Sequence, residues 1–176
     1  MLKSSLKIAF SLFSMPYFAL YFKANMENIQ EVLFPVDHCW KIDFACPDLG
    51  SVRENVSICV LDEVDTSDGR GTCNLLLKLD GSRAAQVSLT EVKKVTSRVY
   101  TAEMSGSFQP IIALDCRGVE PIKWRPTGYY NATSSSGGIF EEVDLSEGDW
   151  FEYDEAGQFS VGVNDIEWRF QKIAAK

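Results

Sequence analysis

Alternation of apolar and polar residues is the feature that most constrains how this chain can fold. Residues 16–29 carry apolar side chains at every second position, with mostly polar or amphipathic residues between them. Residues 38–46 repeat the pattern, with Trp40, Ile42 and Phe44 on one face. Because successive side chains of a β-strand point to opposite faces, a period of two predicts strands that bury one face.

Apolar and β-branched runs predict six further strands, separated by turn sequences such as Asp68-Gly-Arg-Gly71. Apolar residues make up 45% of the chain and aromatic residues 12%, whereas helix-forming stretches rich in Ala, Lys and Glu are scarce. We therefore predict an all-β fold of mainly antiparallel strands, arranged as a compact domain like a β-sandwich or barrel. The six strands are expected at residues 56–61, 73–79, 84–89, 111–116, 139–145 and 165–173.

We expect a single domain over residues 15–176, because a chain of 176 residues can bury enough surface for one core. Residues 41–46 and 111–116 each end in a cysteine at a turn, which suggests two related halves with these strands in similar places. The apolar faces of the strands predict a buried core. Its expected members are Trp40, Ile42, Phe44, Leu114, Ile166, Trp168 and Phe170.

The charge of the chain argues against binding to nucleic acid or to an anionic membrane. The sequence has 17 basic and 25 acidic residues, a net charge of −8, and such a surface repels polyanions. Residues 126–168 contain ten acids and no Lys or Arg. This stretch predicts either a solvated acidic face or a surface that receives a basic partner. We expect a monomer that binds another protein.

The sequence contains no recognisable set of catalytic residues. The five cysteines are odd in number and never closer than seven residues, so we expect them to be reduced and mostly buried. The single histidine, His38, adjoins Cys39, but neighbours on a strand face opposite sides and cannot act as a base and nucleophile together. We interpret the Arg117/Glu120/Lys123/Arg125 cluster as a salt-bridged loop. A hydrolase or transferase would instead need a polar pocket around that cluster or around His38.

Four stretches together resemble the eukaryotic CXXC-motif-containing zinc-binding protein family over about residues 15–173. They are Phe22-Lys-Ala-Asn-Met-Glu-Asn-Ile29, Asp115-Cys-Arg-Gly-Val-Glu-Pro121, Leu145-Ser-Glu-Gly-Asp-Trp-Phe-Glu-Tyr-Asp-Glu155 and Ser160-Val-Gly-Val163. The resemblance implies a small all-β fold, a structural zinc held by two CxxC pairs in two turns, and no established enzyme activity.

The chain departs from this family at the motif that names it. The first pair falls on Cys46 and Leu49 and the second on Leu79 and Ser82, so one of four thiolates remains. A structural zinc needs four donors of the Cys, His or carboxylate kind, and leucine offers none. We predict a degenerate site without a metal cofactor, whose two turns still meet with Leu49 packed on Leu79.

The sequence therefore favours a non-enzymatic binding or scaffold protein. Its partner surface is expected to include Arg117, Glu120, Trp124, Asp149, Trp150 and Asp154. The alternative is a zinc- or metal-binding protein with relocated ligands, namely Cys39, Cys59, Cys73 and His38.

The start of the chain leaves the compartment open. Residues 1–22 are basic and then apolar, like a secretory signal, and sequons at Asn55 and Asn131 would suit a secreted glycoprotein. Most of the apolar run, however, coincides with the first predicted strand. We therefore favour a cytoplasmic protein, with organelle targeting or secretion through residues 1–22 as alternatives. Residues 1–14 are expected to be an extension that does not pack on the domain, serving as a targeting segment or a non-native start.

Overall fold

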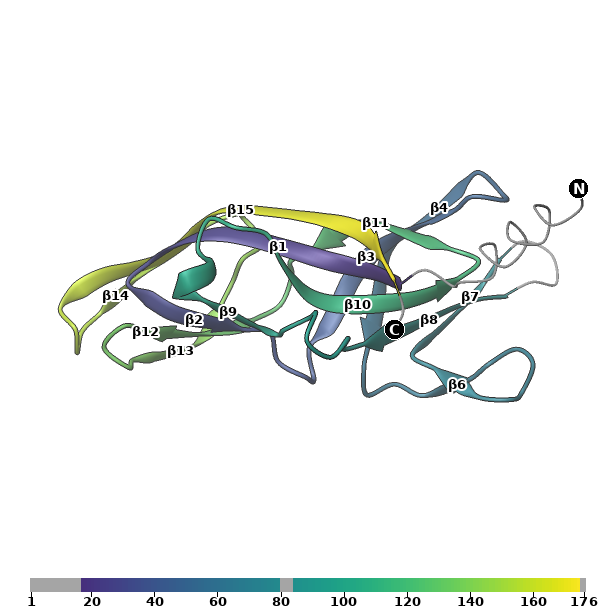
Figure 1. The fold of residues 1–176 in the computed structure, drawn as a ribbon, viewed down its shortest axis with the longest axis horizontal. Helices are drawn as coiled ribbons and strands as arrows, with labels where there is room; N and C mark the ends of the chain where they lie inside the picture. Colours follow the sequence, from purple (N-terminus) through teal and green to yellow (C-terminus); the bar gives the residue numbers. More distant parts are fainter. Residues whose placement is uncertain (1–16, 80–83, 175–176) are drawn as a thin grey trace, which may run out of the picture.

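The computed structural model describes residues 17–79 and 84–174, and the predicted extension 1–14 lies outside them. Within these residues the chain forms antiparallel β-sheets and no α-helix, which confirms the predicted all-β class (Figure 1). In residues 17–79 and 84–174 there is no helix long and apolar enough to cross a membrane. The elements are β1 (Tyr17–Glu27), β2 (Ile29–Leu33), β3 (Cys39–Cys46), β4 (Ser51–Cys59), β5 (Val64–Asp65), β6 (Thr72–Cys73), β7 (Leu75–Lys78), β8 (Ala84–Thr90), β9 (Val99–Thr101), a short 3-10 turn (Ala102–Met104), β10 (Gln109–Arg117), β11 (Glu120–Arg125), β12 (Tyr130–Ser134), β13 (Ile139–Val143), β14 (Trp150–Asp154) and β15 (Phe159–Ile173).

The largest sheet has six strands in the order β14-β15-β1-β10-β8-β7. Strand β1 lies inside it and pairs with β15 from Tyr17 opposite Ile173 to Glu27 opposite Gly162. The alternation of β1 turns Leu20, Phe22 and the other even-numbered apolar residues inward, as predicted. This long pairing makes the molecule elongated, with β14 near one end and β4 and β7 near the other (Figure 1).

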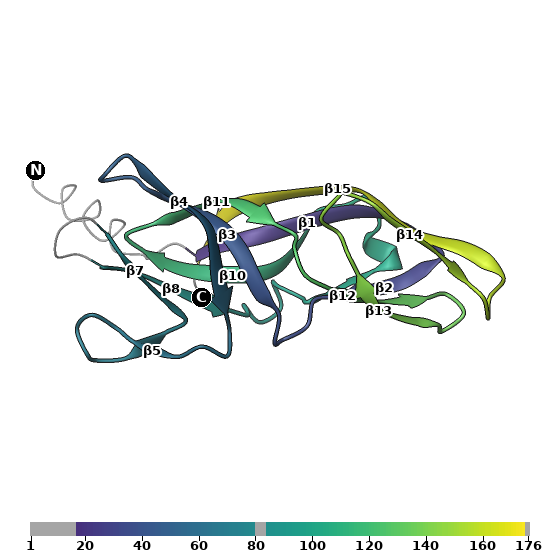
Figure 2. The same ribbon diagram turned by 180° about the vertical axis from the view of Figure 1, so that it is seen from behind.

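Two smaller sheets complete the core, in the orders β11-β3-β4 and β13-β12-β2-β9. In Figure 2, β3 and β4 run steeply across β1 and β10, and their buried side chains join the same core cluster. The prediction of one continuous strand over residues 16–29 is wrong at the C-terminal end, because β1 ends at Glu27. Asn28 adopts a left-handed conformation with φ of 51°, so β2 leaves the six-stranded sheet and enters the four-stranded one.

Aromatic side chains fill the centre of the core. Phe22 makes edge contacts with Phe34 and Tyr100, at centroid distances of 5.2 and 4.9 Å, and Phe34 stacks on Trp40. Trp124 from β11 lies against the same rings. Such pairs are favourable beyond the area that they bury.

The predicted core is confirmed in its first four members, Trp40, Ile42, Phe44 and Leu114, which are buried. Its remaining three members, Ile166, Trp168 and Phe170, are only partly buried. Two of them, Ile166 and Trp168, line an open groove of about 450 Å³ beside β11, and this groove keeps part of their surface in water. Strands β3 and β10 each lie between two antiparallel neighbours, while the related origin of the two halves stays a hypothesis.

Candidate functional site

The turn that carries the first pair of positions closes the β3–β4 hairpin. Strand β3 ends at Cys46, the N–H of Leu49 donates to the Cys46 carbonyl at 3.1 Å, and Gly50 takes a φ of 60° that glycine adopts readily. The Cys46 side chain is buried in the hydrophobic core, whereas that of Leu49 is 45% exposed. The one thiol of the predicted site therefore points away from the turn's solvent side.

The second pair of positions is only half described. Leu79 follows β7 and packs against the core, while Ser82 lies outside the described residues. The meeting of the two turns therefore stays a prediction. Leu49 is 45% exposed, and its packing on Leu79 also stays a prediction.

The cysteines correct the interpretation that all thiols are reduced. Cys39 and Cys59 form a disulfide between directly opposed positions of β3 and β4, with their Cα atoms 4.3 Å apart. That distance is typical of an antiparallel pair without hydrogen bonds, where side chains come closest. Cys46, Cys73 and Cys116 are free and buried.

The relocated metal site is also contradicted. Two of its expected ligands, Cys39 and Cys59, are joined to each other, and the thiol of the third, Cys73, donates to the Leu75 carbonyl at 3.3 Å. Residues 17–79 and 84–174 contain no group of three or more His, Cys, Asp or Glu side chains that could hold a metal ion. The sulfurs in a disulfide are not thiolates, so they cannot serve as zinc ligands in this form.

His38 belongs to the aromatic core rather than to a catalytic pocket. Its Nε2 atom lies 3.2 Å from the Tyr130 hydroxyl, and its ring contacts Trp40 edge-on. Burial lowers the pKa of His38 below its ordinary value, with the charge of Asp37 opposing this effect. The ring also packs so closely on Gly128 that a Cβ there would come within 3.0 Å of it. These contacts give the histidine a structural role.

The predicted partner surface does not form one surface. Trp124 is 1% exposed within the aromatic core, and Asp154 is 4% exposed, so both predictions are wrong. The Asp154 carboxylate accepts hydrogen bonds from the hydroxyls of Ser134, at 2.5 Å, and Ser136, and these bonds lower its pKa. It ties the turn after β12 to the turn after β14. The hydrogen-bonding capacity of this buried carboxylate is therefore engaged within the protein.

The other members of that set lie in two separate regions. Arg117 and Glu120 flank the β10–β11 turn, whereas Asp149 and Trp150 lie at the start of β14 near the opposite end of the molecule (Figure 1). Asp149 is exposed and Trp150 partly buried. Two distinct surfaces therefore replace the single predicted one.

The predicted salt-bridged cluster is divided in the same way. Arg125 binds Asp43 through two hydrogen bonds, of 3.0 and 2.8 Å, which join β11 to β3. Glu120 approaches Lys172 at 3.7 Å, and Arg117 lies 4.0 Å from Asp115. Ion pairs do form here, but two of them connect separate strands and the Arg117–Asp115 pair lies within β10, so they do not brace one loop.

The acidic stretch of residues 126–168 lies largely on the surface, as predicted. Nine of its ten acids are exposed, and Asp154 is the buried one. Strand β14 is the outer strand of the six-stranded sheet, and Phe151 and Tyr153 on it are exposed large hydrophobic side chains. An acidic edge with exposed aromatic rings is therefore available for contact.

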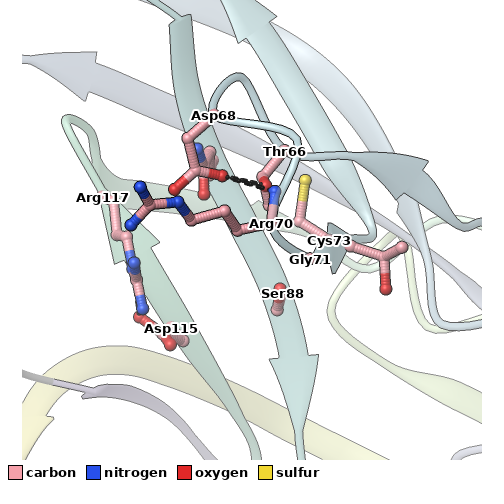
Figure 3. Close-up of a pocket in the computed structure, with 10 residues that line it drawn as sticks. Thr66, Asp68, Arg70, Gly71, Cys73, Ser88, Asp115 and Arg117 are labelled. Carbon is pink, nitrogen blue, oxygen red and sulfur yellow. Dashed lines mark hydrogen bonds and ion pairs between the residues drawn. The ribbon is translucent and has the colours of Figure 1, made fainter.

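A polar pocket of about 260 Å³ was not predicted as a site. It lies between the loop that carries β5 and β6 and the outer face of β8 and β10. In Figure 3 the side chains of Arg70 and Arg117 lie on the same side of this pocket, away from Cys73. The signals were present in the sequence as the Asp68-Gly-Arg-Gly71 turn and the Asp115-Cys-Arg-Gly segment. The first of these is predicted only as a turn, and the second is one of the stretches that resemble the family, with Arg117 in the expected partner surface.

Some charged groups of the pocket are engaged in hydrogen bonds within the protein, and others are not. The Asp68 carboxylate accepts from the Thr66 hydroxyl at 2.6 Å and from the Arg70 backbone N–H at 3.0 Å, and both bonds lower its pKa. The Arg70 guanidinium forms no ion pair within the described part of the chain. The Oδ1 atom of Asp115 is buried and finds no hydrogen-bond partner there.

Comparison with known proteins decides the family. The profile of the eukaryotic CXXC-motif-containing zinc-binding proteins matches residues 19–171. The chain belongs to this family. The CXXC motif containing zinc binding proteins of Xenopus laevis and Homo sapiens are 32% and 33% identical to it over 158 residues, which cover 88% of this chain and 98% and 97% of theirs.

Solved structures agree with this assignment. The crystal structure of C1orf123 superposes with a TM-score of 0.79 at 29% identity, covering 89% of this chain and 99% of that one. A hypothetical protein from Plasmodium falciparum gives a TM-score of 0.82 at 20% identity and covers 88% and 99%, which shows a shared fold. This member of the CXXC-motif-containing family thus keeps the architecture of its relatives.

Proposed function

We propose that this protein is a non-enzymatic binding scaffold that keeps the family fold without the structural zinc. The observation that carries the proposal is the donor set. Cys46 is the one thiol among the four motif positions, and its side chain is buried in the core. Relatives are named for zinc binding, but a single thiol and two leucines do not fit a tetrahedral zinc.

A scaffold without zinc must be stable through its other interactions. The supports available are the shared hydrophobic core, the Cys39–Cys59 disulfide on the same hairpin as Cys46, and the Asp43–Arg125 pair beside it. In zinc-finger peptides the metal supplies roughly 10–16 kcal/mol of apparent binding free energy, so its loss must be offset. The disulfide joins the end of the β3–β4 hairpin opposite the first turn, and Asp43 lies on β3 between that disulfide and the turn.

Metal analysis of the purified full chain tests the loss of zinc. We expect far less than one zinc per chain and no change in the unfolding midpoint when a chelator is added. Stoichiometric zinc together with a chelator-induced drop in the midpoint would overturn the proposal.

A gain-of-function variant sharpens the test. Introducing Leu49→Cys, Leu79→Cys and Ser82→Cys together restores four thiols, and we expect this variant to bind zinc if the turns meet. The matched control adds Cys46→Ser, which leaves three thiols and should weaken zinc binding strongly. Equal zinc binding by the two variants would show that Cys46 does not belong to the site.

The partner surface that best supports scaffolding is the acidic edge formed by residues 147–155, which include β14. Its backbone is open on one side, and Phe151 and Tyr153 offer faces to cations. We propose that it receives an extended basic segment of a protein partner. Nucleic acid and anionic membranes are disfavoured by the net charge of −8.

A short synthetic peptide that alternates lysine and valine can serve as the probe for this edge. We expect binding that weakens with salt and is abolished by Asp149→Lys with Glu152→Lys. Glu63→Lys, a reversal at an exposed acid distant in sequence, is the control. Binding that is unchanged by the double reversal, or that an acidic peptide matches, would refute this surface.

The cytoplasmic location stays a prediction. The Cys39–Cys59 disulfide weighs against it, because disulfides persist in oxidising compartments and are rare in the cytosol. Thiol counting on protein isolated from its own cells, with alkylation at lysis, distinguishes the two cases. Three reactive thiols after unfolding indicate an oxidising compartment, and five indicate a reducing one.

A further inference from the structure

We propose that the polar pocket beside β8 and β10 binds a small zwitterion of the α-amino-acid type, with its carboxylate on Arg70 and Arg117 and its ammonium on Asp115. This inference is independent of the zinc question and of the acidic edge. It rests on the charged groups that the fold brings together there and leaves without full partners.

The donor side of the pocket consists of two guanidinium groups. Arg70 comes from the turn between β5 and β6, and Arg117 from the end of β10, 47 residues later in the chain. The Arg117 Nε atom is 4.0 Å from the Asp115 carboxylate, at the limit of an ion pair, so it retains hydrogen-bonding capacity. Guanidinium groups bind planar carboxylates in a bidentate manner.

The position of Arg70 is set by the turn rather than by its own side chain. The Asp68 carboxylate accepts from the Thr66 hydroxyl and from the Arg70 backbone N–H, and Gly69 between them adopts a φ of 68°. A turn fixed in this way presents the arginine toward the pocket without using its guanidinium. Figure 3 shows the arginine side chain extending from this turn along the side where Arg117 lies.

The acceptor side is Asp115. Its side chain is 24% exposed, and its Oδ1 atom is buried, lies 4.0 Å from the Arg117 Nε atom and has no hydrogen-bond partner among the described residues. Because the side chain is partly exposed and its ion-pair partner is 4.0 Å away, the carboxylate keeps the capacity to accept a hydrogen bond from a ligand. An ammonium group supplies both the hydrogen bond and the opposite charge.

The overall charge of the pocket selects a neutral ligand that carries both charges. Two arginines face two aspartates, so the site has no net charge, and the protein as a whole carries −8. A multiply charged anion is repelled by the protein's field, whereas a zwitterion is not. A volume of about 260 Å³ is small for a binding site and suits a ligand of amino-acid size.

Titration of the full chain with each of the twenty standard α-amino acids, followed by calorimetry or ligand-observed NMR, tests the proposal. We expect at least one of them to bind with a Kd of about 1 mM or lower, which corresponds to roughly −4 kcal/mol. Its N-acetyl derivative, which lacks the ammonium, and its amide, which lacks the carboxylate, should each bind about tenfold more weakly or worse, since each loses a charged hydrogen bond.

Variants identify the site. Arg70→Gln, Arg117→Gln and Asp115→Asn should each weaken binding about tenfold while the unfolding midpoint stays near that of the native chain. Lys93→Gln, which removes an exposed charge that does not line the pocket, should leave binding unchanged. No binding by any amino acid, equal binding of the blocked derivatives, or binding only of inorganic phosphate would overturn the proposal, as would indifference to the three pocket variants.

Discussion

Removal of the disulfide between β3 and β4 should destabilise the protein without unfolding it. Cys39 and Cys59 are separated by 20 residues, and a loop of that size lowers the entropy of the unfolded chain by an amount equivalent to about 3.3 kcal/mol at 25 °C in the chain-entropy model. The change is the double variant Cys39→Ala with Cys59→Ala. For a chain of this length, each kcal/mol lowers the unfolding midpoint by about 2–4 °C, so the expected drop is roughly 7–13 °C.

The measurement is thermal and urea unfolding of the native and double-variant chains, followed by circular dichroism. We expect a lower urea midpoint for the variant, and a urea m-value no smaller than that of the native chain because the denatured variant is no longer cross-linked. Native protein treated with reductant should unfold at the midpoint of the double variant. The variant itself should not respond to reductant, which provides the control.

A native chain with the same midpoint in the presence and absence of reductant would refute the reasoning. So would mass spectrometry of the alkylated, unreduced chain that finds five reactive thiols. In the first case the bond would not constrain the unfolded state, and in the second it would not form.

Two further predictions concern buried carboxylates. Asp43→Ala leaves the Arg125 guanidinium without its partner and should lower the free energy of unfolding by about 3 kcal/mol. This is the low end for a broken buried pair, because Arg125 is 32% exposed. The control is Glu167→Ala at an exposed pair, which should lower it by less than about 1 kcal/mol in the same urea titration. Because hydrogen bonds hold the pKa of Asp154 below its ordinary value, its stabilising contribution is present above about pH 4 and is lost as pH falls through the folded pKa. Ser134→Ala should therefore flatten the acid limb of stability against pH, and an unchanged limb would contradict this.

The sequence predicted the strands whose alternation is sharp. Strands β3, β8 and β10 lie within two residues of their expected bounds, because each buries one face against the shared core. Strand β14 was missed because Trp150–Asp154 are mostly exposed, so no apolar period marks them. Strand β11 was missed because it contains Pro121, which is usually excluded from strand interiors.

The site was predicted less well than the fold because it depends on tertiary contacts. The residues at the motif positions can be identified in the sequence, but the burial of Cys46 and the exposure of Leu49 depend on how the hairpin packs. The polar pocket joins segments 47 residues apart, at Arg70 and Arg117, and no local pattern indicates such a meeting.

The disulfide was missed for a reason that can be stated in terms of register. Around the turn at residues 47–50, Cys46 pairs with Ser51 and Phe44 with Arg53, a register that would place Cys39 opposite residue 58. One extra residue on β4 shifts the pairing, so that Ile42 faces Val56 and Cys39 faces Cys59. This is a β-bulge, and sequence alternation alone does not reveal it.

The bulge also connects the disulfide to the buried ion pair. Asn55 within it adopts a φ of 53°, and its N–H donates to the Asp43 Oδ1 atom at 2.7 Å, while the same carboxylate binds Arg125 from β11. Asp43 thus satisfies the backbone group that the bulge leaves unpaired and holds the register that sets Cys59 opposite Cys39. Loss of Asp43 should therefore weaken the ion pair and also the preference for this pairing of cysteines, so its cost should be smaller in the chain that already lacks the disulfide.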